Sequence, residues 1–123
     1  MKNLDQIRAQ NALKAAGDSS FKGENKGEVV KKVPAMIQQN GLLGTLAFAI
    51  SKTQGQEKGY EEVLKASIEH YFKLPNVVKP KATDLEGFSK WLCEQDAAQL
   101  RAVTTEFLAY LNYLRRYVDK NKK

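Results

Sequence analysis

Few residues of this 123-residue chain could perform acid–base or nucleophilic chemistry. His70 is the only histidine and Cys93 is the only cysteine, so a Ser-His-Asp or Cys-His arrangement would have to use His70. These two residues fall in different predicted helices, and their spacing gives no support for a contact. His70 lies near the C-terminal end of its helix, where the helix dipole favours partial positive charge. We therefore predict a structural role for His70 and no catalytic residue.

Acidic residues could bind a divalent ion, but such a site needs several carboxylates that converge on one point. The closest candidates are Asp84 with Glu86 and the adjacent pair Glu61 and Glu62. Both pairs fall at predicted helix starts, where capping and the helix dipole already account for acidic residues. One cysteine cannot form a thiolate metal cage, and no glycine-rich phosphate loop follows a strand. The sequence thus predicts no metal, no cofactor and no small-molecule substrate.

Basic residues offer a different chemistry, which is contact with phosphate groups. The chain has 20 Lys and Arg residues against 14 Asp and Glu residues, and its formal net charge of +6 favours polyanionic partners. Lys31 and Lys32 lie on the polar face of one predicted helix. A second polar face, on the last predicted helix, comprises Arg101, Thr105, Asn112 and Arg116. Such side chains in a line suit contact with successive phosphates, although an ordinary exposed helix face explains them equally well.

The elements that must position these residues are helices. Apolar residues recur at three- and four-residue spacings, and no alternating pattern typical of strands competes with them. The sequence predicts an all-α fold, a compact single-domain bundle of five to six helices over residues 1–123. Three predicted helices begin with the spacing of a capping box: Asn3 with Gln6, Thr83 with Glu86, and Asp96 with Gln99.

The central predicted helices span residues 28–40, 42–52 and 60–73. The first two are separated at Asn40 and Gly41, because glycine adopts left-handed backbone geometry freely. Pro34 lies inside the first, so that helix either kinks at Pro34 or begins near it. The last helix has an apolar seam at Leu100, Val103, Phe107, Tyr110, Leu114 and Tyr117. Tyr113 lies off this seam, beside the polar face.

Three segments are predicted to connect or end these helices. Gly17–Gly27 contains three glycines and two serines, which predicts a flexible loop, and residues 53–59 have a similar loop-like composition. Lys120–Lys123 is predicted to be a disordered basic tail. No apolar run approaches the roughly 20 residues that cross a bilayer, and the first residues do not form a signal-peptide core. We therefore expect a cytoplasmic protein with no membrane partner.

Two blocks of the sequence carry a family resemblance. The first, residues 31–49, is lysine-rich at its start and contains the pattern Pro-x-x-Ile-x-x-Asn-Gly-Leu before an alanine- and leucine-rich helix. The second, residues 102–117, contains threonine, glutamate and leucine at helical spacing and ends in Arg115 and Arg116. With both blocks in this order, the chain resembles, from Leu4 to Tyr117, the small helical subunit of Cmr-type (type III-B) CRISPR effector complexes.

The resemblance implies a non-catalytic subunit that stacks along a ribonucleoprotein filament and contacts the phosphates of target RNA during antiviral RNA interference. Its implied partners are other Cmr subunits, further copies of this chain, the CRISPR guide RNA and target RNA. The RNA-binding residues at matching positions are Lys31, Lys32, Arg115 and Arg116. Lys52 and Arg101 join them because of their predicted helix faces.

Two other functions stay open from the sequence. A purely structural adaptor without RNA contact would depend on packing residues such as Gly44 and Phe48. An enzyme that turns over RNA would depend on His70. Substitution of the basic residues distinguishes the adaptor from the RNA-contacting subunit, because only the latter would lose RNA capture.

Overall fold

The computed structural model describes residues 3–17, 24–51, 59–75 and 77–121, with side chains described in the same ranges except at 24–28 and 119–121. Within these ranges the chain forms five helices and no strand. They are α1 (Leu4–Ala16), α2 (Glu24–Ser51), α3 (Tyr60–Phe72), α4 (Leu85–Cys93) and α5 (Ala97–Asn121). The predicted all-α fold is confirmed.

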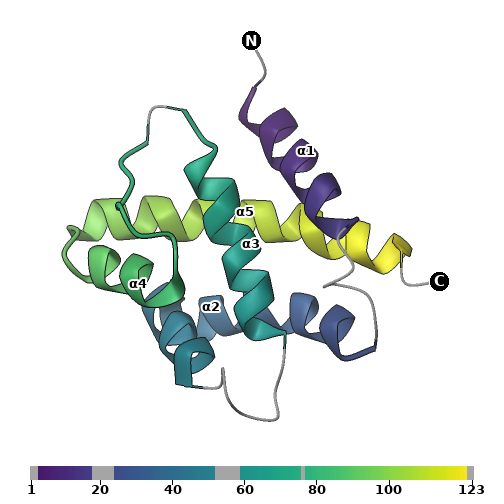
Figure 1. Cartoon of the computed structure of the whole chain (residues 1–123), viewed down its shortest axis with the longest axis horizontal. Coiled ribbons are helices and arrows are strands. Elements are labelled where there is room, and N and C mark those ends of the chain that lie inside the picture. Colours follow the sequence, from purple (N-terminus) through teal and green to yellow (C-terminus); the bar gives the residue numbers. More distant parts are fainter. Residues whose placement is uncertain (1–2, 18–23, 52–58, 76, 122–123) are drawn as a thin grey trace.

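The two longest helices, α2 and α5, lie side by side and run in opposite directions (Figure 1). Helix α3 crosses this pair on one side, and α1 lies across the C-terminal half of α5 (Figure 1). Helix α4 lies beside the N-terminal part of α5 and packs on α2 and α3. All five helices contribute to one buried cluster of apolar side chains, in which Tyr71, Phe88 and Phe107 pack ring against ring. The beginning of α2 therefore lies at the same end of the molecule as the end of α5.

Helix α2 is two helical segments joined at Gly41. Gly41 has φ +81° and ψ +162°, a backbone geometry that glycine adopts without the penalty of a side chain. The Thr45 hydroxyl donates a hydrogen bond to the Gly41 carbonyl at 2.9 Å and so supports the corner. The predicted break at Asn40 and Gly41 is confirmed. Pro34 lies well inside the first segment, so the alternative in which that helix begins near Pro34 is wrong.

Some predicted boundaries were also wrong. Helix α2 begins at Glu24, so the last four residues of the predicted loop Gly17–Gly27 are helical; residues 18–23 lie outside the described residues. Helix α5 continues to Asn121, so the first half of the predicted tail Lys120–Lys123 is also helical. A long amphipathic helix extends beyond its last buried residue because each further residue adds one backbone hydrogen bond. Lys122 and Lys123 lie outside the described residues.

Two of the three predicted capping boxes involve an observed cap bond. The box at Asn3 is complete, since its side chain and that of Gln6 each accept an amide hydrogen bond at 2.8 Å. At α5, Asp96 accepts from the Gln99 amide at 2.8 Å, but the Gln99 side chain donates to the Tyr71 hydroxyl instead. The cap of α5 therefore has the hydrogen bond to the Asp96 side chain but not the reciprocal bond to the Gln99 side chain.

The predicted capping box between Thr83 and Glu86 is wrong, because the N-cap of the helix lies one residue later in the chain. The N-cap of α4 is Asp84, whose carbonyl accepts the first helical bond from Phe88 at 2.9 Å, and its side chain makes no cap bond. A Cβ at Gly87 would lie 2.3 Å from the Ala82 Cβ and 2.6 Å from Asp84 Oδ1. Close packing of this entry segment on Gly87 therefore sets the start of α4.

The apolar seam predicted on α5 is largely correct. Val103, Phe107, Tyr110 and Leu114 are buried, whereas Leu100 and Tyr117 are half-buried at its two ends. Leu111 and Val118 are buried as well, which widens the apolar face of α5. No helix in the described part of the chain is long and apolar enough to span a membrane.

Candidate nucleic-acid interface

The outer face of α5 presents the polar row that the sequence predicted. Arg101, Thr105, Asn112 and Arg116 are all exposed. At 3.6 residues per turn they fall within an arc of about 60° around the helix. With a rise of about 1.5 Å per residue, Arg101 and Arg116 lie roughly 22 Å apart along its axis. One straight face of α5 thus displays two guanidinium groups at its ends and neutral polar groups between them.

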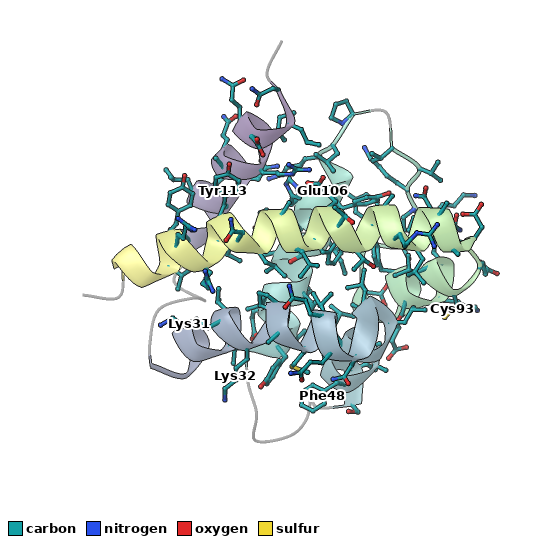
Figure 2. The ribbon with its side chains drawn as sticks, turned by 180° about the vertical axis from the view of Figure 1, so that it is seen from behind. Lys31, Lys32, Phe48, Cys93, Glu106 and Tyr113 are labelled. Carbon is teal, nitrogen blue, oxygen red and sulfur yellow. The ribbon has the colours of Figure 1, made fainter. Side chains whose placement is uncertain are left out.

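Lys31 and Lys32 lie near the beginning of α2, between buried Val30 and buried Val33, and both are exposed. Figure 2 shows them on the same side of the molecule as the C-terminal end of α5. Because α2 and α5 are antiparallel, this end of the pair also carries Arg115 and Arg116, which are exposed. We call these four residues, Lys31, Lys32, Arg115 and Arg116, the α2–α5 basic end.

Arg101 belongs to a different place. It lines a cavity of about 450 Å³ between the N-terminal part of α5 and the corner of α2 at Asn40–Leu43. Its distance from Arg115 along α5 is about 21 Å. The structure therefore separates Arg101 from the α2–α5 basic end. Lys52 lies outside the described residues.

Most of these cations have no partner among the described side chains. No described side chain forms a hydrogen bond or ion pair with Lys32, Arg101, Arg115 or Arg116. Lys31 differs, because it has a contact within the protein. An exposed cation without an internal partner keeps its full charge available for an external anion.

The aromatic residue that lies beside this polar row is partly covered. Tyr113 is half-buried and stacks on Tyr117 with ring centroids 6.4 Å apart and an interplanar angle of 22°. Figure 2 places Tyr113 beside α1. The pair therefore packs along the border between α5 and α1.

A buried polar network, which the sequence reasoning missed, joins three helices behind this surface. Arg8 of α1 donates two hydrogen bonds to Glu106 of α5, from Nε at 2.8 Å and from Nη2 at 2.7 Å. Glu106 also lies 2.8 Å from Nε2 of His70 on α3, and the Asn11 amide nitrogen lies 2.9 Å from the other ring nitrogen of His70. The His70 ring stacks on Tyr110 at 4.4 Å. Figure 2 shows Glu106 pointing into the space between α5 and α1.

The electrostatics of the network favour an ionised carboxylate. Burial raises the pKa of Glu106, but the hydrogen bonds and charges of Arg8 and His70 more than offset burial and lower this pKa to about 2. The hydrogen bond to Glu106 raises the pKa of Arg8 above its ordinary range. Arg8 and Glu106 therefore form a bidentate ion pair with side chains only 17% and 9% exposed.

This network also decides the role of His70. Both ring nitrogens are engaged and the residue is 1% exposed, so in this arrangement neither nitrogen is available for acid–base chemistry on a substrate. Cys93 is exposed at the end of α4, far along the molecule from Glu106 (Figure 2). The structure does not bring His70 and Cys93 together. Contact with Glu106, and not the helix dipole, is the main interaction of His70.

One sequence signal could have revealed the network. Glu106 lies three residues after Val103 and four residues before Tyr110, so helical spacing places this carboxylate on the buried face of α5. A buried glutamate requires a cationic or hydrogen-bonding partner. The sequence does not say which of the basic residues provides it. Nowhere in the described ranges do three or more His, Cys, Asp or Glu side chains gather as metal ligands.

The five-helix bundle and its exposed cations define a small, basic, all-helical protein whose polar surface suits binding to polyanions. A family model described as "CRISPR-associated protein (Cas_Cmr5)" matches residues 4–120. The chain therefore belongs to the CRISPR-associated Cmr5 family. The crystal structure of a CRISPR-associated Cmr5 family protein from Thermus thermophilus is similar, with a TM-score of 0.73 and 22% sequence identity. The match covers 99% of this chain and 100% of that chain, and it shows that the two share a fold.

Proposed function

We propose that this protein is a non-catalytic small subunit of a type III-B CRISPR (Cmr) effector complex. In this function it stacks with further copies and other Cmr subunits along the ribonucleoprotein filament and contacts target RNA during antiviral RNA interference in the cytoplasm. The observation that carries the proposal is the α2–α5 basic end, in which Lys32, Arg115 and Arg116 are exposed and have no described partner. Membership of the Cmr5 family supports the assembly.

The chemistry of these side chains suits contact with the RNA backbone. Arginine offers several N–H donors in a planar fork that matches phosphate oxygens, and lysine adds a compact positive charge. Such contacts position a protein on nucleic acid and carry no sequence information. Target choice would then come from base pairing between guide RNA and target RNA, while this subunit supplies charge and shape.

A non-enzymatic role fits the interior as well. His70 is held by Asn11 and Glu106, and its ring is stacked on Tyr110, so the single histidine of the chain serves packing. No step of the proposed function requires a metal or a cofactor.

Salt titration of target-RNA capture by the reconstituted complex tests the RNA contact. Replacing Lys32, Arg115 and Arg116 by alanine should weaken capture and reduce the slope of log affinity against log salt. Each phosphate that is no longer neutralised should lower the magnitude of the slope by about 0.7 to 0.9, so the three substitutions together should lower it by roughly 2 to 3. The matched control replaces Lys79, Lys81 and Lys90, which are exposed elsewhere, and removes the same charge.

Equal slopes for the two triple variants would contradict the assigned RNA surface. If both variants also captured RNA like the unmodified protein, the adaptor function would be favoured instead. One observation supports that second candidate: Gly44 is exposed on α2, and a Cβ there would touch only the Asn40 Cβ at 3.4 Å. A larger residue at Gly44 should then block assembly without unfolding the chain.

A further inference from the structure

A cavity of about 520 Å³ lies between the C-terminal half of α1, the length of α3 and Tyr110 of α5, and none of the four residues of the α2–α5 basic end lines it. Its volume falls within the roughly 300–1,000 Å³ that small-molecule sites usually have. Polar groups on three different helices converge on it. This combination of room and convergent polar groups marks it as a candidate ligand site.

Tyr110 provides an unsatisfied hydroxyl to this cavity. The residue is 1% exposed and its ring is fixed by the stack on His70, yet its hydroxyl makes no hydrogen bond with any described residue. In the described part of the chain, no fully enclosed side-chain oxygen or nitrogen atom lacks a partner. The hydroxyl of Tyr110 must therefore reach the cavity that this residue lines. Buried polar groups are nearly always paired with protein or water, so a hydroxyl placed in this way is accessible to a ligand that enters the cavity and displaces water.

The hydroxyl can act as a donor. Burial and the nearby charge of Glu69 both raise the pKa of Tyr110, so the phenol keeps its proton at neutral pH. An oxygen acceptor of a ligand is the partner that this group fits best.

Charged side chains surround the same cavity. Lys14 of α1, Lys65 of α3 and Lys73 directly after α3 line it together with Glu62 and Glu69, which leaves one positive charge in excess. None of the five forms a hydrogen bond or ion pair with another described side chain. Since neither the lysines nor the glutamates are paired with a described side chain, the lining fits a ligand that combines an anionic group with hydrogen-bond donors.

We propose that this cavity binds a nucleoside monophosphate, either free or as the 5′-phosphorylated end of an RNA. The lysines hold the phosphate, the Tyr110 hydroxyl donates to an oxygen of the ligand, and Glu62 and Glu69 accept from ribose hydroxyls or a base amino group. A bare phosphate would use only the lysines and would meet the two carboxylates unfavourably. The residues that line this cavity are not those of the proposed RNA-contact surface, so this proposal does not depend on the proposed function.

Titration of the isolated full-length chain with adenosine monophosphate, followed by NMR of backbone amides, tests this site. Saturable shifts are expected along α3 around Lys65 and Glu69, and adenosine or inorganic phosphate alone should bind more weakly. Tyr110→Phe should raise the dissociation constant about tenfold, the usual effect of removing a hydrogen bond to a charged group. Lys90→Ala, on α4, is the control and should leave the constant unchanged.

The phenylalanine variant should stay folded because the missing hydroxyl has no partner within the described protein, and a thermal melt would verify this. No saturable shifts at millimolar nucleotide, or equal affinity of the Tyr110→Phe variant, would overturn the proposal. A further titration distinguishes a free nucleotide from an RNA end as the ligand. It adds short RNAs with and without a 5′-phosphate to the variant with alanine at Lys32, Arg115 and Arg116. A preference for the phosphorylated RNA assigns the site to an RNA end, and binding of the mononucleotide alone assigns it to a free nucleotide.

Discussion

The molecule holds arginine in two contrasting surroundings. Arg8 is committed to Glu106 and Asp5 inside the contact between α1 and the rest of the bundle. Arg115 and Arg116 lie exposed near the end of α5, and no described carboxylate pairs with them. The comparison shows that a positive charge indicates binding only where it is unpaired. Pairing and burial assign Arg8 to stability, whereas the proposed RNA contact uses Lys32, Arg115 and Arg116, which have no described partner.

The largest effect should come from breaking the interior pair. Glu106→Gln removes the buried counter-ion of Arg8 and should lower the free energy of unfolding by about 3 kcal/mol, because only the exposed carboxylate of Asp5 then remains beside a largely buried cation. Urea denaturation followed by circular dichroism measures this change. Glu94→Gln, at the exposed C-cap position of α4, is the control and should shift stability by no more than about 0.5 kcal/mol. Similar losses in both variants would remove the distinction between the two regions.

A more conservative change should have a smaller effect. Arg8→Lys keeps the positive charge but cannot form the two parallel hydrogen bonds to Glu106, so the loss should be about 1–2 kcal/mol. The same denaturation experiment applies. In the Glu106→Gln background this substitution should cost less, and full additivity would show that the two residues do not interact.

Acid should weaken the interior region selectively. The pKa of Glu106 falls from 4.5 to about 2 in the folded protein, so the unfolded chain binds more protons between these values. The contribution of Glu106 is therefore present above about pH 5 and is lost as the pH falls toward 2. Stability measured across this range should decline less steeply in Glu106→Gln than in the unmodified protein. Parallel curves would contradict the lowered pKa.

The smallest effect on stability is expected at the surface. Alanine at Lys32, Arg115 and Arg116 should change the free energy of unfolding by about 0.5 kcal/mol or less, since exposed side chains without partners contribute little. The melting curve of this triple variant should overlay that of the unmodified protein. Marked destabilisation would mean that these residues have a structural role like that of Arg8.

The sequence predicted what depends on local periodicity. The break at Gly41, the cap at Asn3 and the seam through Phe107 follow from spacing and residue type, and the structure confirms them. The start of α4 was misplaced by one residue because the capping-box spacing does not specify the backbone path that brings Ala82 and Asp84 against Gly87.

Long-range pairing accounts for what was missed at the site. Arg8 and Glu106 are 98 residues apart in the chain, and only the packing of α1 on α5 brings them together. Packing between helices also separates two of the cations. Helical spacing grouped Arg101 with Arg116, but in the structure Arg101 lines a separate cavity beside the corner of α2. Lys31 and Lys32 lie at the same end of the molecule as Arg115 because α2 and α5 are antiparallel, and helical spacing alone does not predict this arrangement.

Photo-crosslinking within the reconstituted complex tests the central claim most directly. A photoreactive amino acid is placed either at Arg116, on the α2–α5 basic end, or at Lys90, which is exposed on α4. We predict that the probe at position 116 crosslinks to bound target RNA and that the probe at position 90 does not. Crosslinking from position 90 only, or from neither position in a complex that retains its RNA, would contradict the account.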